Sequence, residues 1–398
     1  LSIFMRINML DNKDEPICFV LVSGMIRSGT TLLSRIISSH PDIFIASDIL
    51  LPVLKSIKSD CLKLDGPIKD GYFDNTIEKF EFQKIIKQEI SEEKFQDLAD
   101  KMYKSWYMED SLKSYIYSLD YSNYENLIKD ILFKIQELSG GKKMIGVKEA
   151  YFDEFIPLMK GIFPSFKSIH IIRNPMATYN SINEQDISYP LVYTLKFWRR
   201  HVNLALYNSI NFPDSTLIIR YEDVITNTKL VLEKIAYFFW QDIDIRMFNC
   251  ESWKKLGGEP WQGNSYIVDN RRGLGIYTSS LDKWKENITE DQMQLTSLMC
   301  APEISVYYPE LSLDSKFFMN YESFLTASKS TNKEKLKFPT FLSLEYFNEN
   351  YYLVWSQETN RYEEYVQNTP LSEKDKIERF LSKKVYNYFY EYKLEKFH

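Results

Sequence analysis

The chain has 398 residues, of which 44% are hydrophobic and 26% are charged, and its formal net charge is -6. This composition is typical of a soluble globular protein with room for one large domain and an appendage, or for two domains. The negative charge argues against a nucleic-acid-binding protein, although it leaves room for local basic pockets.

The first strong pattern is a run of strand-forming residues at 18–23 that leads into the sequence GMIRSGTT at 24–31. Two glycines that bracket four residues let the backbone turn tightly and present its N–H groups to an anion. Apolar periodicity then predicts a helix that ends near His40, and its N-terminus adds a positive dipole end. The arrangement predicts a phosphate-binding loop, with a ligand-free glycine turn as the alternative.

This loop lacks the lysine that follows the second glycine in ATP- and GTP-binding P-loops, because Thr30 stands there. In those proteins the lysine reaches the β- and γ-phosphates and the next hydroxyl residue holds Mg²⁺. The basic residue here is Arg27, inside the loop. A magnesium-triphosphate site is therefore disfavoured, whereas a phosphate monoester or a phosphosulfate needs positive charge but not necessarily a metal. The residues predicted to bind the anion are Arg27, Ser28, Gly29, Thr30 and Thr31.

Further strand and helix patterns alternate along the chain. Strands are predicted at 144–148, 168–173 and 216–221, and helices at 153–162, from 174, at 189–210 and at 227–239. Near-continuous apolar strands that alternate with helices favour a parallel sheet covered on both faces. We therefore expect an α/β, P-loop-like fold of three layers. Residues 76–138 are charged and helical in pattern, and we interpret the region at about 60–140 as a helical insertion that forms part of an acceptor site or a lid.

Four polar residues lie at or just past the carboxyl ends of the predicted strands: Arg27, Lys148, Arg173 and Tyr221. Ligands of open parallel sheets bind at that edge. The sequence therefore predicts that these side chains meet at one site.

The chain changes character from about residue 313 onward. Residues 328–333 are typical of a linker, and the aromatic runs 351–355 and 361–366 flank 357–360 as the strands of a hairpin would. A helix is predicted at 372–395. We interpret 313–398 as an aromatic-rich C-terminal appendage of linker, hairpin and helix, which serves packing or homodimerisation rather than catalysis.

Several of these motifs together resemble the PAPS-dependent sulfotransferases, where PAPS is 3′-phosphoadenylyl sulfate. The matching segments are the loop at 24–33 with His40-Pro41-Asp42, Arg173-Asn174-Pro175 with Ser181, Tyr221-Glu222-Asp223, and Leu281-Asp282-Lys283-Trp284. The resemblance covers about residues 17–312, the expected sulfotransferase domain. The RSGTT form of the loop is closer to the carbohydrate, tyrosylprotein and bacterial branches than to the cytosolic small-molecule branch.

The resemblance implies two anion sites, one for each phosphate group of PAPS. The first loop would hold the 5′-phosphosulfate, and Arg173 with Ser181 would hold the 3′-phosphate. A structural ion pair for Arg173 and a plain helix serine at 181 remain alternatives. Tyr221 would contact the adenine or pack at a strand end, and a cofactor-covering segment would bring Arg271, Arg272 and Ser280 toward the 3′-phosphate.

The same resemblance implies the catalytic residues. Arg27 and Lys148 would neutralise charge on the leaving PAP, the desulfated product of PAPS, although Glu149-Ala150 follows the lysine where the family usually has Thr-Pro or Asp-Pro. An acceptor hydroxyl needs a base, and the position of the family's glutamate matches Asp48, which is one methylene shorter. Asp48 could instead cap the segment that begins at residue 49. The histidine base of the cytosolic branch has no well-placed counterpart, with His201 left open.

We therefore predict a PAPS-dependent sulfotransferase of the EC 2.8.2 class that uses in-line transfer and needs no metal. The acceptor is unidentified: a sugar, a lipid headgroup, a peptide tyrosine or a small metabolite. The rival hypotheses are a P-loop kinase-like enzyme that uses ATP and a non-catalytic PAP(S)-binding relative.

The remaining features bear on location. The cysteines Cys18, Cys61, Cys250 and Cys300 are far apart, which predicts free thiols without a zinc site or a disulfide framework. No apolar run is long enough to span a membrane, and the start shows no signal peptide, although Met5 is a plausible true start. These features favour the cytoplasm.

Overall fold

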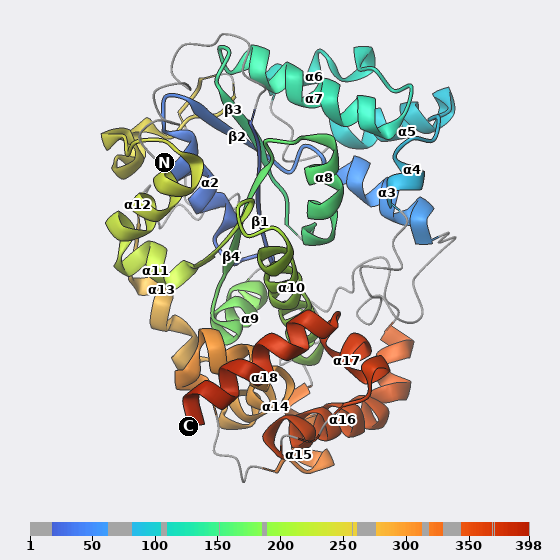
Figure 1. Ribbon diagram of the computed structural model, residues 1–398, viewed down its shortest axis with the longest axis vertical. Helices are drawn as coiled ribbons and strands as arrows, with labels where there is room; N and C mark the ends of the chain where they lie inside the picture. Colours follow the sequence, from blue (N-terminus) through green and yellow to red (C-terminus); the bar gives the residue numbers. More distant parts are fainter. Residues whose placement is uncertain are drawn as a thin grey trace.

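The computed structural model describes residues 18–62, 82–104, 110–150, 152–184, 189–256, 258–260, 276–312, 318–328, 344–367, 369 and 371–397. In this part of the chain five strands form one sheet in the order β2-β3-β1-β4-β5, and every neighbouring pair is parallel. The strands are β1 (Cys18–Gly24), β2 (Ile43–Ser47), β3 (Met144–Lys148), β4 (Lys167–Ile172) and β5 (Thr216–Arg220). Figure 1 shows the sheet at the centre with helices on both sides. The predicted α/β fold of three layers is confirmed.

The α-helices are α2 (Thr30–Ser38), α3 (Leu51–Leu62), α4 (Phe82–Ile85), α5 (Glu92–Tyr103), α6 (Asp110–Lys113), α7 (Tyr124–Leu138), α8 (Ile156–Ile162), α9 (Pro175–Asn183), α10 (Leu191–Asn211), α11 (Tyr221–Thr226), α12 (Thr228–Phe239), α13 (Ser279–Asp282), α14 (Glu290–Tyr307), α15 (Tyr321–Ser328), α16 (Leu344–Gln367), α17 (Glu373–Phe380) and α18 (Lys383–Phe397). The helices predicted between 153 and 239 are confirmed, and α4 to α7 give the insertion its predicted helical character.

Alternating residues of the central strand face different cores. Val20 and Val22 of β1 pack with the apolar residues of α2 and α12, whereas Phe19 and Leu21 pack with those of α3, α7 and α8. Because a strand buried on both faces has no polar side, its sequence is a continuous apolar run. This is why the apolar residues of β1 and β4 predict strands.

Strand β2 was not predicted. Its five residues are all buried, and Ile43 pairs with Met144 of β3. The strand is short and follows Pro41-Asp42 after a helix, and its pairing partner lies far along the chain. Tertiary pairing rather than a long local pattern therefore defines this strand.

Gly146 of β3 provides a test of this packing. A Cβ at this position would overlap the Val20 carbonyl oxygen and come within 2.6 Å of Ile45 Cδ1. We expect Gly146→Ala to lower the free energy of unfolding by about 1–3 kcal/mol, as overpacked cores do. In the control Gly161→Ala, the new Cβ meets only the flexible end of Gln83, so α8 should lose no stability. Urea denaturation of both variants measures this, and an unchanged stability in Gly146→Ala would contradict the packing of β1 against β3.

The predicted C-terminal hairpin is wrong, because α16 runs through both of its expected strands. Val354, Glu358 and Tyr362 are spaced four residues apart and are all buried, which is a helical periodicity. The aromatic residues suggested a strand through their high β-propensity, but packing of this helix face against α14 and α15 outweighs that preference. The helix predicted at 372–395 is confirmed as α17 and α18, and the domain boundary near 312 stays a prediction.

The two helical regions lie at opposite ends of the molecule. In Figure 1 the insertion helices α5 to α7, coloured cyan to teal, are at the top, and α14 to α18, coloured orange to red, are at the bottom. Buried residues of α9, α10, α14, α15 and α16 belong to one hydrophobic cluster, so the C-terminal helices pack directly against the sheet-flanking layer.

Candidate functional site

The carboxyl ends of the five parallel strands bring the predicted site residues to one edge of the sheet. The loop at 24–29 follows β1, Asp48 follows β2, Lys148 ends β3, Arg173 follows β4 and Tyr221 follows β5. The arrangement places the phosphate-type loop in the middle of this edge. Asp48 and Lys148 lie on one flank of the loop, and Arg173 and Tyr221 lie on the other.

The loop after β1 is built by residues in left-handed conformations. Gly24, Arg27 and Gly29 have φ values of 152°, 64° and 100°. Gly29 also makes room for a neighbour, because a Cβ there would overlap the Tyr221 ring. Glycine at this position therefore allows the close approach of Tyr221 as well as the tight turn that the sequence predicts.

The loop keeps the donors that an anion requires. No side chain caps α2, and its first intrahelical hydrogen bond runs from Leu33 N–H to the Gly29 carbonyl. By helix geometry the N–H groups of Thr30 to Leu32 have no intrahelical acceptor, whereas the Ser28 N–H donates to the Met25 carbonyl at 3.1 Å. The Ser28 hydroxyl is buried, 1% exposed, and has no hydrogen-bond partner among the described residues. An orphaned buried hydroxyl beside uncapped amides fits the chemistry of a bound phosphate or sulfate oxygen.

Arg27, Ser181 and Arg173, which are distant in sequence, meet beside this loop. Arg27 Nε donates to Ser181 Oγ at 3.1 Å, and Arg173 Nη1 donates to the Arg27 carbonyl at 2.9 Å. Arg173 Nη2 donates to the Ser280 carbonyl at 2.9 Å, and Arg173 Nε is buried without a partner in the described residues. Arg173 is thus held by two backbone carbonyls, and no salt bridge joins it to a carboxylate of the described residues.

Tyr221 lies against the same cluster. The Arg173 guanidinium sits 4.5 Å from the centre of the Tyr221 ring, and the Tyr221 hydroxyl is 2.8 Å from Ser280 Oγ. Ser280 belongs to α13, so this short helix contacts both Arg173 and Tyr221 through one residue. Arg271 and Arg272, which were predicted to act with it, lie outside the described residues.

Asn174 explains why Ser181 is in reach. Its side chain accepts hydrogen bonds from the N–H groups of Met176 and Ala177, at 2.9 and 3.2 Å, and so caps α9. Pro175 occupies the first turn, where its fixed φ suits a helix start. The cap aims α9 so that Ser181 faces Arg27.

Asp48 and Lys148 form a buried ion pair on the other flank. The Asp48 N–H also donates to the Lys148 carbonyl at 2.7 Å, and Asp48 has a left-handed backbone with φ 50°. A non-glycine residue in this conformation is strained and persists only where its surroundings impose it. The structure thus places the predicted base beside the predicted leaving-group cation.

Glu149, rather than Asp48, binds the start of α3. Its Oε1 accepts from the Leu50 N–H at 2.6 Å, while Oε2 has no partner in the described residues. Burial, and after it the neighbouring Asp48 carboxylate, raise the pKa of Glu149 well above its usual value. The side chain is fully buried, which disfavours its charged form beside the ion pair. Sequence reasoning noticed Glu149 only as a departure after Lys148 and gave it no role.

The raised pKa of Glu149 predicts a pH-dependent stability. Above about pH 4.5 the unfolded chain releases the Glu149 proton, whereas the folded chain keeps it until pH reaches the raised pKa. Stability is therefore lost as pH rises through this window, by about 1.4 kcal/mol per unit of pKa elevation. Glu149→Gln cannot ionise, so we expect it to match the wild type near pH 4 and to be more stable at pH 8.

Denaturant unfolding of both proteins from pH 4 to 8 measures this difference. The exposed carboxylate Glu286 gives the control, because Glu286→Gln makes the same chemical change on the surface, away from the Asp48–Lys148 pair. A constant difference between wild type and Glu149→Gln across the range would contradict a raised pKa of Glu149.

The histidine left open by the sequence is engaged elsewhere. His201 Nδ1 and His170 Nδ1 contact the two oxygens of Asp153, at 2.7 and 2.6 Å, in a buried cluster under α10. Burial lowers the pKa of His201 and so disfavours its charged form.

Two further properties concern the described part of the chain. There, no group of three or more His, Cys, Asp or Glu residues is placed to hold a metal ion. Over the same residues, none of the helices combines the length and apolar character that crossing a bilayer demands.

Comparison with known proteins gives one family and several relatives. A model described as "Sulfotransferase family" matches residues 20–244, more than half of the chain. A putative protein-tyrosine sulfotransferase of Caenorhabditis briggsae is 20% identical over 300 residues, which cover 72% of this chain and 86% of that protein.

Solved structures give weaker similarities. The sulfotransferase domain from the olefin synthase of Synechococcus PCC 7002 has a TM-score of 0.41 and 17% identity, covering 70% of this chain and 90% of that one. Mouse sulfotransferase SULT7A1 complexed with PAP has a TM-score of 0.31 and 12% identity, covering 92% and 94%. Because these scores lie below 0.5, conclusions about chemistry rest on the residues of this chain.

Proposed function

This chain belongs to the sulfotransferase family, and from that premise we propose that it transfers a sulfuryl group from PAPS to a hydroxyl or amine of its acceptor. The observation that carries the proposal is the presence of two clusters of hydrogen-bond donors at one sheet edge, each of which could bind an anion. The uncapped loop with the orphaned Ser28 hydroxyl is one cluster, and Arg173 with Ser181 is the other. PAPS carries two separate anionic groups, so it matches this layout better than a nucleoside triphosphate does.

We assign the residues that would contact each of the two phosphate groups of PAPS. Ser28, Gly29, Thr30 and Thr31 would hold the 5′-phosphosulfate through backbone and hydroxyl donors. Arg173, Ser181 and Ser280 would hold the 3′-phosphate, and the buried Arg173 Nε supplies a donor with no partner in the described residues. Arg27 lies between the two sites, because it belongs to the loop and contacts Ser181. The contact of Tyr221 with adenine and the roles of Arg271 and Arg272 stay predictions.

The proposed reaction is a single in-line displacement. The bond from the acceptor oxygen to sulfur forms as the bond from sulfur to the PAP oxygen breaks, and the acceptor proton passes to Asp48. Lys148 and Arg27 would neutralise the negative charge left on PAP. Since Asp48 and Lys148 are paired in this structure, donor binding would draw Lys148 toward PAPS and leave the carboxylate to the acceptor. No step in this scheme uses a metal.

A screen with PAPS labelled in its sulfuryl group tests the function directly. Sugars, lipid headgroups, tyrosine peptides and small metabolites are offered as acceptors, and transfer of label with release of PAP is the expected result. Transfer of phosphate from ATP in the presence of Mg²⁺ would instead support the kinase-like alternative. PAP binding without transfer to any acceptor would support a non-catalytic relative. Cytoplasmic location, homodimerisation and the similarity to the bacterial branch of the family stay predictions from the sequence.

A further inference from the structure

Side chains from other elements bind both polar groups of the peptide bond between Arg173 and Asn174, and so hold this turn. Trp198 of α10 donates its indole N–H to the Arg173 carbonyl at 2.7 Å. Glu222 of α11 accepts from the Asn174 N–H at 3.0 Å through Oε1. Its Oε2 accepts from the Tyr308 hydroxyl at 2.8 Å. The residue assigned to the 3′-phosphate therefore depends on α10, on α11 and on the residue that follows α14.

These two supports belong to one packed cluster. The rings of Trp198 and Tyr308 lie 6.2 Å apart, and the Arg220 guanidinium lies 4.6 Å from the Tyr308 ring. Tyr308 is fully buried, so its hydroxyl has little freedom to leave Glu222. A shift of either α10 or the end of α14 would therefore be transmitted to the turn through a short, rigid path.

Helix α16 fixes α10 and α14 relative to each other. Arg199, the neighbour of Trp198, makes two hydrogen bonds to Glu358 at 2.5 and 3.0 Å. One helical turn along α16, Arg361 pairs with Glu303 of α14 at 2.8 Å. Both arginines also donate to the Met299 carbonyl, at 2.7 and 3.1 Å. Buried ion pairs of this kind add little net stability, but they penalise any other arrangement of the helices.

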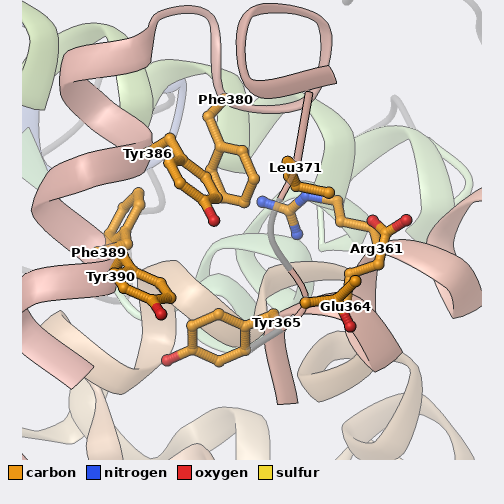
Figure 2. A pocket seen from close by; sticks show the side chains of 9 residues that line it. Arg361, Glu364, Tyr365, Leu371, Phe380, Tyr386, Phe389 and Tyr390 are labelled. Atoms are coloured by element: carbon orange, nitrogen blue, oxygen red, sulfur yellow. The ribbon is translucent and has the colours of Figure 1, made fainter. Parts of the chain in front are cut away.

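The C-terminal helices around Arg361 are tightly packed. Figure 2 shows Arg361 among the aromatic side chains of α16, α17 and α18, and its guanidinium lies 4.8 Å from the centre of the Phe380 ring. The cavity that these residues line measures about 20 Å³, which is space for about one water molecule. This region is therefore suited to mechanical support and has no room here for a substrate.

We infer that the C-terminal helices brace the 3′-phosphate site. Through Arg199–Glu358 and Arg361–Glu303 they hold α10 and α14, and Trp198 and Tyr308 on those elements set the position of the Arg173-Asn174 turn. Trp198, Glu222 and Tyr308 are positioning residues, since they act through Arg173. The inference rests on the proposed function, which gives Arg173 its ligand. Glu303, Tyr308, Glu358 and Arg361 lie beyond residues 20–244, so the brace is an addition to the segment that the family model matches.

The test compares Tyr308→Phe with Tyr307→Phe in the full-length protein. Tyr308→Phe removes the hydroxyl that binds Glu222, whereas Tyr307→Phe removes a hydroxyl from the adjacent residue, which lies near Glu303 and is not the partner of Glu222. We expect Tyr308→Phe to weaken PAP binding by calorimetry, and to raise KM for PAPS, by about 3- to 10-fold. Its kcat should change by less than about twofold, and Tyr307→Phe should match the wild type in all three values. Glu358→Gln tests the brace one step further away, and its PAP affinity should fall in the same direction.

The outcomes separate the inference from the proposed function. If the wild type binds PAP and both Tyr308→Phe and Glu358→Gln bind it equally well, with only a lower melting temperature, then these residues serve stability alone and the brace is refuted. If the wild type itself does not bind PAP, the proposed function fails and the brace has no ligand to serve.

Discussion

Asp48→Asn is expected to lower kcat by about 10²- to 10⁴-fold, the range for removal of a general base. The amide keeps the size of the side chain but cannot accept the acceptor proton. PAP affinity should change far less, because Asp48 follows β2, whereas the loop and Arg173, which are proposed to hold the two phosphate groups, follow β1 and β4. Single-turnover rates with saturating PAPS and acceptor measure the effect without interference from binding.

Asp48→Glu is the matched control for this variant. It keeps the carboxylate and lengthens the side chain by one methylene, so it should keep a substantial part of the activity. Since Asp48→Asn leaves the buried Lys148 without its carboxylate, a loss of stability is also expected. Rates must therefore be measured well below the melting temperature of each variant. If Asp48→Asn turned over within about threefold of the wild type, another group would have to be the base.

Lys148→Met is expected to lower kcat by about 10²- to 10³-fold, the cost of removing one group that stabilises transition-state charge. Methionine keeps an unbranched apolar side chain of similar length, but it has no positive charge to offset the negative charge on the leaving oxygen. Because that charge develops only as the sulfur–oxygen bond breaks, the KM for PAPS should rise much less than kcat falls.

Lys148→Arg serves as the control, because it keeps the charge while changing the geometry, and it should retain more activity than the methionine variant. A Lys148→Met enzyme with unchanged kcat and a raised KM would show that Lys148 binds the donor without assisting the chemistry.

Local pattern was sufficient for much of the fold. The apolar runs of β1 and β4 and the glycine-bracketed loop between β1 and α2 have strong signals, because their sequence neighbours determine their structure. β2 and α16 show the limit of such reasoning. Ile43 to Ser47 form a strand because β3 is beside them, and residues 351–366 form a helix because one face of that helix packs against α14 and α15.

The candidate site divides in the same way. Arg27, Lys148, Arg173 and Tyr221 could be assigned to one edge because parallel strands share the position of their carboxyl ends. Contacts between distant residues could not be read from the sequence. Arg27 with Ser181, and Tyr308 with Glu222, depend on how whole helices are packed. Glu149 was overlooked because its importance comes from complete burial, which no single position in a sequence reveals.

Isothermal titration calorimetry of the full-length chain with PAP, and separately with ATP and Mg²⁺, tests whether the site binds two separate phosphate groups without a metal. PAP is expected to bind equally well with magnesium and with a chelator present. Arg173→Ala is expected to weaken this binding by about 10- to 100-fold, the scale for hydrogen bonds to a charged group. Binding of ATP only with Mg²⁺, together with no heat from PAP, would contradict a site built for two separate phosphate groups.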